Sequence, residues 1–79
     1  MHIIIYTKDH CPNCTTAKQL LAAKGLPFEN RDIEVPLWFE TLNMLHPEAR
    51  QMPQIFIDGQ RVGGLAGLHA ALKQLEAQP

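Results

Sequence analysis

The chain has 79 residues, 46% of them hydrophobic, and its 7 Lys and Arg against 8 Asp and Glu give a formal net charge of −1. This length predicts a single domain, residues 1–79, with a small core, and the lack of any long run of one charge argues against a nucleic-acid partner. The apolar stretch near the start, residues 3–5, is too short for a signal sequence or a membrane span, so we expect a cytoplasmic protein.

The first part of the chain predicts a strand, a helix and a second strand. Residues 2–6 are apolar and β-branched, which suits a strand buried on both faces. Pro12 suits the first position of a helix, apolar residues follow at helical spacing, and Gly25 is a natural stop. Residues 26–33 alternate weakly and are expected to form the second strand, parallel to the first because a helix connects them.

A second helix is predicted to begin at Pro36. Trp38, Leu42 and Leu45 fall on one face of it. Trp38 and Phe39 are expected to pack in the core or at its edge, because large rings are usually buried.

The last part of the chain predicts a hairpin and a terminal helix. In residues 54–64, QIFIDGQRVGG, two short apolar runs flank Asp58-Gly59, and both turn residues tolerate positive φ. Leucines then recur at a three-four spacing and are expected to face the core: Leu65, Leu68, Leu72 and Leu75. The order β-α-β-α-β-β-α indicates a mixed four-stranded sheet flanked by helices on both faces.

The only two cysteines, Cys11 and Cys14, stand where the first strand gives way to the first helix. Cys11 is predicted at the N-cap, where free N–H groups and the helix dipole favour an anion, and Lys8 and His10 can add positive charge. We therefore predict that the pKa of Cys11 is well below the ordinary value of about 8.5. Cys14 lies one turn further in and is expected to be buried. These positions make Cys11 the attacking thiol and Cys14 the resolving thiol.

Two other interpretations of the pair have less support. A structural zinc site takes four ligands, and the chain offers two cysteines with histidines that form no second paired motif, so no metal is expected. A permanent disulfide would close a very short loop and suits a reducing cytoplasm poorly. His46 and His69 are interpreted as solvated or capping residues because neither has a partner motif.

Together, CPNC, MPQIFIDGQRVGG and the final helix make the chain resemble a glutaredoxin, of the small dithiol type found in bacteria or phages. The resemblance extends over essentially the whole sequence. It implies the α/β thioredoxin-like fold and a thiol–disulfide oxidoreductase. It further implies that glutathione serves as reductant or co-substrate, that no cofactor is bound, and that the protein is a monomer acting on disulfide-containing proteins.

The resemblance also implies a glutathione site. Lys8 matches the family's lysine that contacts the glycine carboxylate of glutathione. The Met52–Pro53 bond is implied to be cis, with Met52 backbone groups pairing with the cysteinyl part. Gly63 and Gly64 match a double glycine where the backbone approaches the ligand and the last helix begins.

Two departures from the family pattern affect this site. Asn13 stands where the family usually has tyrosine, in one wall of the glutathione groove. After the double glycine, where the family commonly has two aspartates, the groove residues are Leu65 and Ala66, followed by Gly67. Weaker binding of glutathione is expected, or binding through another residue: Arg50 or Gln51.

Other functions stay open at the level of sequence. One alternative is a redoxin reduced by thioredoxin reductase that donates electrons to ribonucleotide reductase, although the terminal Trp-Ser-Gly-Phe pattern of that group is absent. A second is an iron–sulfur carrier in which Cys11 of two chains and two glutathiones hold a cluster, which Pro12 disfavours by resemblance. A third, disfavoured by the intact cysteine pair, is an adaptor without activity.

Overall fold

The computed structural model describes residues 1–77 and contains seven elements in the predicted order. They are β1 (Ile3–Thr7), α1 (Pro12–Ala23), β2 (Glu29–Asp32), α2 (Pro36–Leu45), β3 (Gln54–Ile57), β4 (Gln60–Gly63) and α3 (Leu65–Glu76). The strands form one sheet in the order β2-β1-β3-β4, with β1 parallel to β2 and every other pair antiparallel. The predicted thioredoxin-like fold, a mixed four-stranded sheet with three helices, is confirmed.

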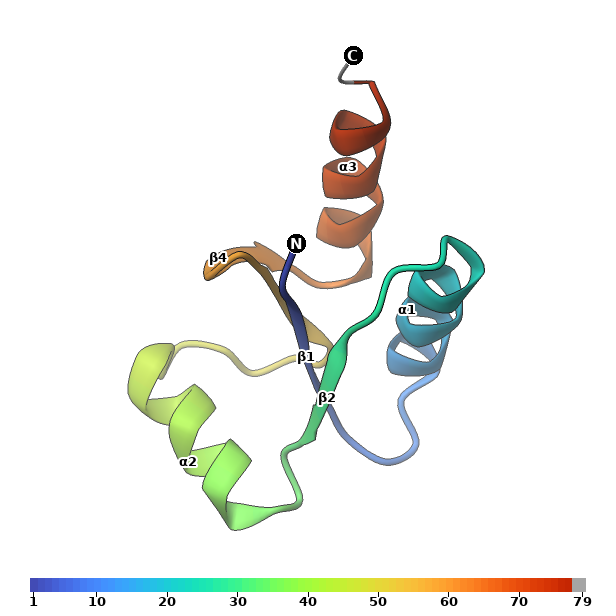
Figure 1. Cartoon of the computed structure of the whole chain (residues 1–79). Coiled ribbons are helices and arrows are strands. Elements are labelled where there is room, and N and C mark those ends of the chain that lie inside the picture. The colour runs from blue at the N-terminus through green and yellow to red at the C-terminus, as the bar shows by residue number, and fades with distance from the viewer. Residues whose placement is uncertain (78–79) are drawn as a thin grey trace.

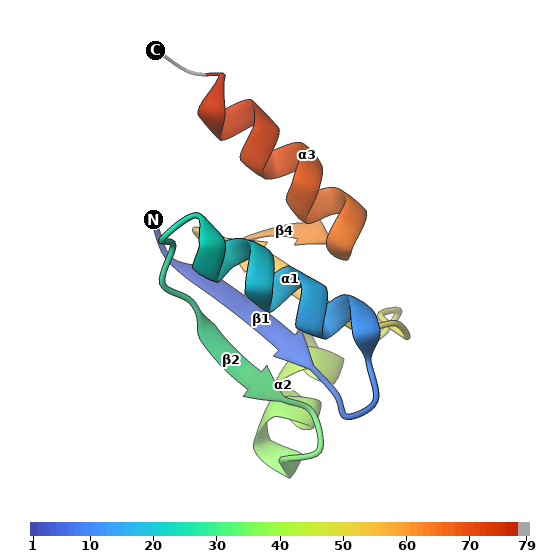
Figure 2. The same ribbon diagram turned by 90° about the vertical axis from the view of Figure 1, so that its right-hand side faces the viewer.

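Helices cover both faces of the sheet: α1 and α3 lie on one side, and α2 lies on the other (Figures 1 and 2). Successive residues of a strand point to opposite faces, so Ile5 packs under α1 and α3 while Tyr6 packs towards α2. The larger core comprises Ile3, Ile5, Ala17, Leu21, Ile55, Leu68 and Leu72. The smaller core comprises Tyr6, Leu42 and Phe56, with Trp38 and Met52 among the half-buried residues against it.

The topology brings three chain segments to one end of the sheet. Tyr6 near the end of β1 pairs with Gln54 at the start of β3, and Gly63 at the end of β4 pairs with Ile55. Because both pairs are antiparallel, three segments meet there: the loop into α1, the segment before β3 and the start of α3. The two cysteines, Met52-Pro53 and the double glycine are therefore neighbours in space although they are far apart in sequence.

The second strand and the last helix are as predicted in kind, with shorter packed regions. The second strand covers residues 29–32 rather than 26–33. Because β2 is an edge strand, its first two residues, Glu29 and Asn30, are exposed, and its last two are half-buried. Leu26 and Phe28, just before it, still pack against the larger core. In α3, Leu68 and Leu72 are buried, whereas Leu75, expected in the core, is 39% exposed at the far end of the helix.

The prediction that Phe39 packs in the core or at its edge is wrong, and Leu45, placed on the same face of α2 as the buried Leu42, is not buried either. Leu45 is 61% exposed and Phe39 is 51% exposed. The ring of His46, the C-cap of α2, instead lies against Phe56 with centroids 5.3 Å apart. Trp38 is half-buried as expected, at the edge of the smaller core. The guanidinium of Arg31, from β2, lies over its ring, 4.3 Å from the ring centroid.

The hairpin turn forms as predicted, with Asp58 and Gly59 both at positive φ, 50° and 81°. Within residues 1–77, no helix is long and apolar enough to span a membrane.

Candidate active site

Cys11 lies at the N-cap of α1, as predicted, with Pro12 as the first helical residue. Its backbone is extended (φ −122°, ψ 95°), and its sulfur accepts a hydrogen bond from the Cys14 N–H at 3.2 Å. This contact uses one of the free N–H groups at the start of the helix. An N-cap position of this kind favours negative charge on the capping atom.

The two cysteines are joined in a disulfide, with Cα atoms 5.2 Å apart. Cys11 is half-buried, and Cys14 is 2% exposed within the helix. A molecule arriving from solvent can therefore reach Cys11 more readily than Cys14.

Two adjoining clefts open beside Cys11. The first, of about 420 Å³, is lined by Lys8, His10, Cys11, Pro12, Asn13, Arg50, Gln51 and Met52. The second, of about 320 Å³, is lined by Asn13, Gln51, Met52, Pro53, Gln54, Gly64, Leu65 and Ala66. The clefts share Asn13, Gln51 and Met52, so they form one groove that runs from Lys8 to the start of α3.

The groove contains most of the residues that the sequence nominated. Lys8, Cys11, Asn13 and Met52 line its first part, and Pro53, Gly64, Leu65 and Ala66 line its second part. Two nominated residues do not line it: Cys14 lies buried in α1, and Gly63 precedes the lining residue Gly64 at the end of β4.

The backbone of the groove includes the cis bond that the resemblance implied. The Met52–Pro53 peptide bond is cis. Met52 comes before β3, which begins at Gln54, so its backbone lies outside the strand. Gly64 is the N-cap of α3 and makes no side-chain capping bond. A Cβ at Gly64 would stand 3.6 Å from the Pro53 carbonyl oxygen, so the two backbone segments lie next to each other across the groove.

Positive charge predominates in the groove. Lys8 and Arg50 line its first part beside His10, and among residues 1–77 no Asp or Glu lines either part. Ala66 stands at the start of α3 where the family would place a carboxylate. The groove therefore favours a ligand that carries negative charge.

A cluster of carboxylates near the groove was not anticipated from the sequence. Side-chain oxygens of Asp9, Asp32 and Glu34 lie within 4.8 Å of one another. A hydrogen bond with Asp9, together with the charge of that residue, raises the pKa of Glu34. Asp32 pairs with Thr7 at the end of β1, so only the strand register reveals that these residues meet.

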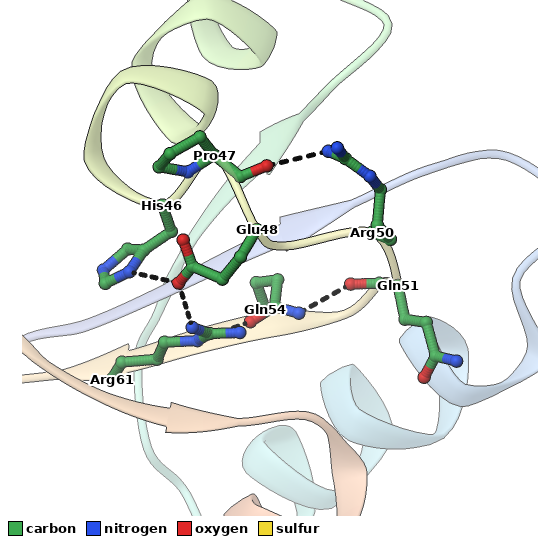
Figure 3. A network of polar contacts seen from close by, with 7 residues as sticks. All are labelled: His46, Pro47, Glu48, Arg50, Gln51, Gln54 and Arg61. Atoms are coloured by element: carbon green, nitrogen blue, oxygen red, sulfur yellow. Dashed lines mark hydrogen bonds and ion pairs between the residues drawn. The ribbon is translucent and has the colours of Figure 1, made fainter.

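A second unanticipated feature is a polar network around the segment that precedes β3 (Figure 3). It links Glu48, Arg61 and Gln54 to the backbone of Gln51, next to Met52. Gln54 is one of the two buried polar residues among those described, at 6% exposure. A buried glutamine at the start of an otherwise apolar strand, QIFI, is the sequence signal that could have indicated such a network.

Comparisons with known proteins agree with this fold. Residues 3–62 match the sequence profile of the glutaredoxin family. Glutaredoxin 3 of Escherichia coli K12 is 38% identical over 69 residues, covering 87% of this chain and 83% of the relative. The NMR structure of reduced Escherichia coli glutaredoxin aligns with a TM-score of 0.76 at 29% identity, over 98% of this chain and 100% of the other. The NrdH-redoxin of Escherichia coli, described as glutaredoxin-like with a thioredoxin-like activity profile, aligns over the full length of both chains with a TM-score of 0.78 at 26% identity.

Proposed function

This chain belongs to the glutaredoxin family, whose members are thiol–disulfide oxidoreductases, and from that premise we propose that it reduces protein disulfides and glutathione mixed disulfides with glutathione as its reductant. The observation that carries the proposal is the cysteine pair. Cys11 is half-buried at the start of α1 beside an open groove, and Cys14 is buried one turn behind it. A nucleophile and a resolving thiol need this difference in access.

The proposed reaction begins with the dithiol. The Cys11 thiolate attacks one sulfur of a substrate disulfide; a new S–S bond forms, the substrate S–S bond breaks, and the other substrate sulfur leaves and takes up a proton. The Cys14 thiolate then attacks the Cys11 sulfur, which closes the protein disulfide and releases the second substrate thiol. The substrate gains two electrons and the cysteine pair loses two.

Two glutathiones restore the dithiol. The first attacks the Cys11 sulfur and expels Cys14, and the second attacks the bound glutathionyl sulfur and releases oxidised glutathione. With a protein–glutathione mixed disulfide, Cys11 attacks the glutathionyl sulfur directly and the protein leaves as a thiol. Cys14 is then not needed. These steps require no bound metal or organic cofactor.

The groove supplies the proposed contacts to glutathione. Lys8 pairs with the glycine carboxylate, and the Met52 backbone before cis-Pro53 pairs with the cysteinyl part. The γ-glutamyl carboxylate lies at the start of α3, where N–H groups are free to donate. The remaining walls are formed by Asn13, Gly64, Leu65 and Ala66, and Gly63 lies directly before Gly64 at the end of β4. Support comes from the lining of the groove and from its positive charge.

The partners in this proposal are glutathione and disulfide-containing proteins, with the protein acting as a monomer in the cytoplasm. A reducing compartment is part of the proposal because a glutathione pool is needed to return the pair to the dithiol.

The test is turnover of a glutathionylated peptide by the reduced protein with glutathione and glutathione reductase, compared with thioredoxin reductase as the only reductant. We expect turnover with glutathione, loss of it in Cys11→Ser, and retained deglutathionylation in Cys14→Ser. Turnover that depends on thioredoxin reductase alone would reject glutathione as the reductant.

A second candidate is a redoxin reduced by thioredoxin reductase that supplies ribonucleotide reductase. Two observations favour it: the full-length structural match to the NrdH-redoxin and the lack of a carboxylate at Ala66 in the groove. The same comparison of reductants separates the two candidates.

A further inference from the structure

The segment between α2 and β3 carries the Met52 backbone but belongs to no helix or strand over residues 46–53. Its position next to Cys11 must therefore be set by side-chain contacts. The Met52 carbonyl oxygen lies 3.5 Å from the Cys11 sulfur, and Met52 lines both parts of the groove. A displacement of this segment would change the docking of any substrate that pairs with it.

Gln54 connects this segment to the sheet. Its Nε2 donates to the Gln51 carbonyl oxygen at 2.7 Å, and its Oε1 accepts from the Nε of Arg61 on β4 at 3.0 Å (Figure 3). Gln54 is 6% exposed, so an amide left without either partner would be costly.

The orientation of the Gln54 amide is fixed by its two partners. A guanidinium can only donate and a carbonyl oxygen can only accept, so the amide oxygen must face Arg61 and the amide NH2 must face Gln51. If the amide were rotated by 180°, its NH2 group would face the Arg61 N–H group and its oxygen would face the Gln51 carbonyl oxygen, so neither hydrogen bond could form. Arg61 thereby directs the NH2 group of Gln54 towards the segment.

Arg61 is held in turn by Glu48. Its NH1 donates to the Glu48 Oε1 at 2.8 Å, and the His46 Nδ1 lies 3.2 Å from the same oxygen. Glu48 comes from the segment itself, so contacts pass from the segment to β4, then to β3, and back to the segment at Gln51. Figure 3 shows the Gln51 side chain extending away from this loop of contacts, which uses only its carbonyl.

We propose that Gln54 and Arg61 are positioning residues that hold the Gln51–Met52 backbone in the groove, so that a disulfide substrate docks with its sulfur at Cys11. The proposal rests on the function proposed above. Neither side chain touches the reacting sulfurs. Arg61 lines neither part of the groove, and Gln54, which lines the second part, holds the Gln51 backbone through its amide NH2 group.

The test uses Gln54→Glu, which keeps the size of the side chain and its acceptor for Arg61 but removes the NH2 group that donates to Gln51. The matched control is Gln60→Glu, the same change at an exposed position of β4 beside Arg61, where no network contact is lost. Arg61→Met, at a more exposed site than Gln54, provides a second break in the network if Gln54→Glu does not fold.

For the glutathionylated peptide, Gln54→Glu and Arg61→Met should each raise KM by about tenfold while kcat changes by less than about twofold. Alkylation of Cys11 by iodoacetamide, which needs no backbone pairing, should stay within about twofold of wild type. Arg61→Lys, which can still donate to Gln54, should have a KM between those of Arg61→Met and wild type. A KM equal to that of Gln60→Glu in both variants would overturn the proposal, as would a fall in kcat alone.

A measurement without glutathione keeps this test separate from the proposed function. In the oxidised protein, the 15N order parameters of Gln51 and Met52 should fall in Gln54→Glu and stay unchanged in Gln60→Glu. If wild type does not turn over the peptide, the proposed function fails, and these order parameters decide the positioning role. Unchanged order parameters in Gln54→Glu would reject it.

Discussion

At the scale of single residues, the groups around Cys11 have opposite effects on the stability of its thiolate form. The Cys14 N–H at 3.2 Å favours the thiolate, and a hydrogen bond to a charged group contributes about 1.5–3 kcal/mol. The helix dipole adds about 0.3–1 kcal/mol. The Met52 carbonyl, 3.5 Å from the sulfur, opposes the charge, but the distance is longer than a good hydrogen bond. Because the favourable contacts are the shorter and stronger ones, we expect them to lower the pKa of Cys11 in the reduced protein.

The missing carboxylate at Ala66 gives a prediction about affinity. Ala66→Asp places an acid in the second part of the groove at the start of α3, where the helix dipole tolerates it. We expect KM for the glutathionylated peptide to fall by about tenfold, because the acid can pair with the γ-glutamyl ammonium. A substrate whose glutathione amine is acetylated should show no such gain in a steady-state assay. An unchanged KM for the unmodified substrate would place the γ-glutamyl end elsewhere.

Glu34 gives a prediction about pH and stability. The hydrogen bond with Asp9 and the charge of that residue raise the pKa of Glu34 above its ordinary value of 4.5. A raised pKa means that the stability from protonated Glu34 is present below pH 4.5 and is lost as the pH rises through the folded-state pKa. Glu34→Gln should therefore melt at a higher temperature than wild type at pH 7, with the difference disappearing below pH 4.5.

Glu48 gives the opposite prediction, because its pKa is lowered where that of Glu34 is raised. A hydrogen bond from its own backbone N–H, then His46 and Arg61, lower the pKa of Glu48 from 4.5. Its contribution to stability is present above that value and is lost as the pH falls through the lower folded-state pKa. Glu48→Gln should melt at a lower temperature than wild type at pH 7. Equal shifts in the same direction for both variants, measured by thermal unfolding, would contradict this account.

At the scale of elements, the contact between α3 and β4 explains one glycine that the sequence left unassigned. A Cβ on Gly67 would lie 1.8 Å from the Val62 carbonyl oxygen, so α3 can approach β4 this closely only with glycine there. The same contact means that an aspartate could not replace Gly67 without moving the helix. The departure from the family pattern at this position therefore has a packing reason in this chain.

Gly67→Ala should destabilise the protein by about 1–3 kcal/mol, although alanine is the better helix former. Gly64→Ala serves as the control, because its Cβ would meet the Pro53 oxygen at an ordinary 3.6 Å and its φ of −91° suits any residue. Urea unfolding of the two variants measures the difference. Equal stabilities would show that α3 adjusts to the extra methyl group without cost.

Local sequence patterns predicted the elements well where the signal was itself local. Pro12 and Pro36 begin helices, Asp58-Gly59 makes the turn, and β1 is the buried strand expected from its isoleucines. The errors concern packing between elements. Leu45 has the right helical spacing for the core, but His46 occupies the neighbouring position against Phe56, which no local pattern reveals.

At the scale of the whole molecule, the site is a product of strand order. The cysteine pair could be recognised from the sequence, and the resemblance supplied the cis bond before Pro53 and the residues of the groove. The polar network could not be predicted, because Glu48, Gln54 and Arg61 meet only once β3 and β4 are paired in register. The carboxylates that raise the pKa of Glu34, Asp9 above all, could not be predicted either, because they meet only once β1 and β2 are paired.

The central claim is that Cys11 carries a thiolate at neutral pH because its sulfur occupies the N-cap of α1. The most direct test is the pKa of Cys11 in reduced Cys14→Ser, read from thiolate absorbance near 240 nm as the pH is varied. The account predicts a midpoint well below the value of about 8.5 for a free thiol. A midpoint at or above the free-thiol value would contradict it.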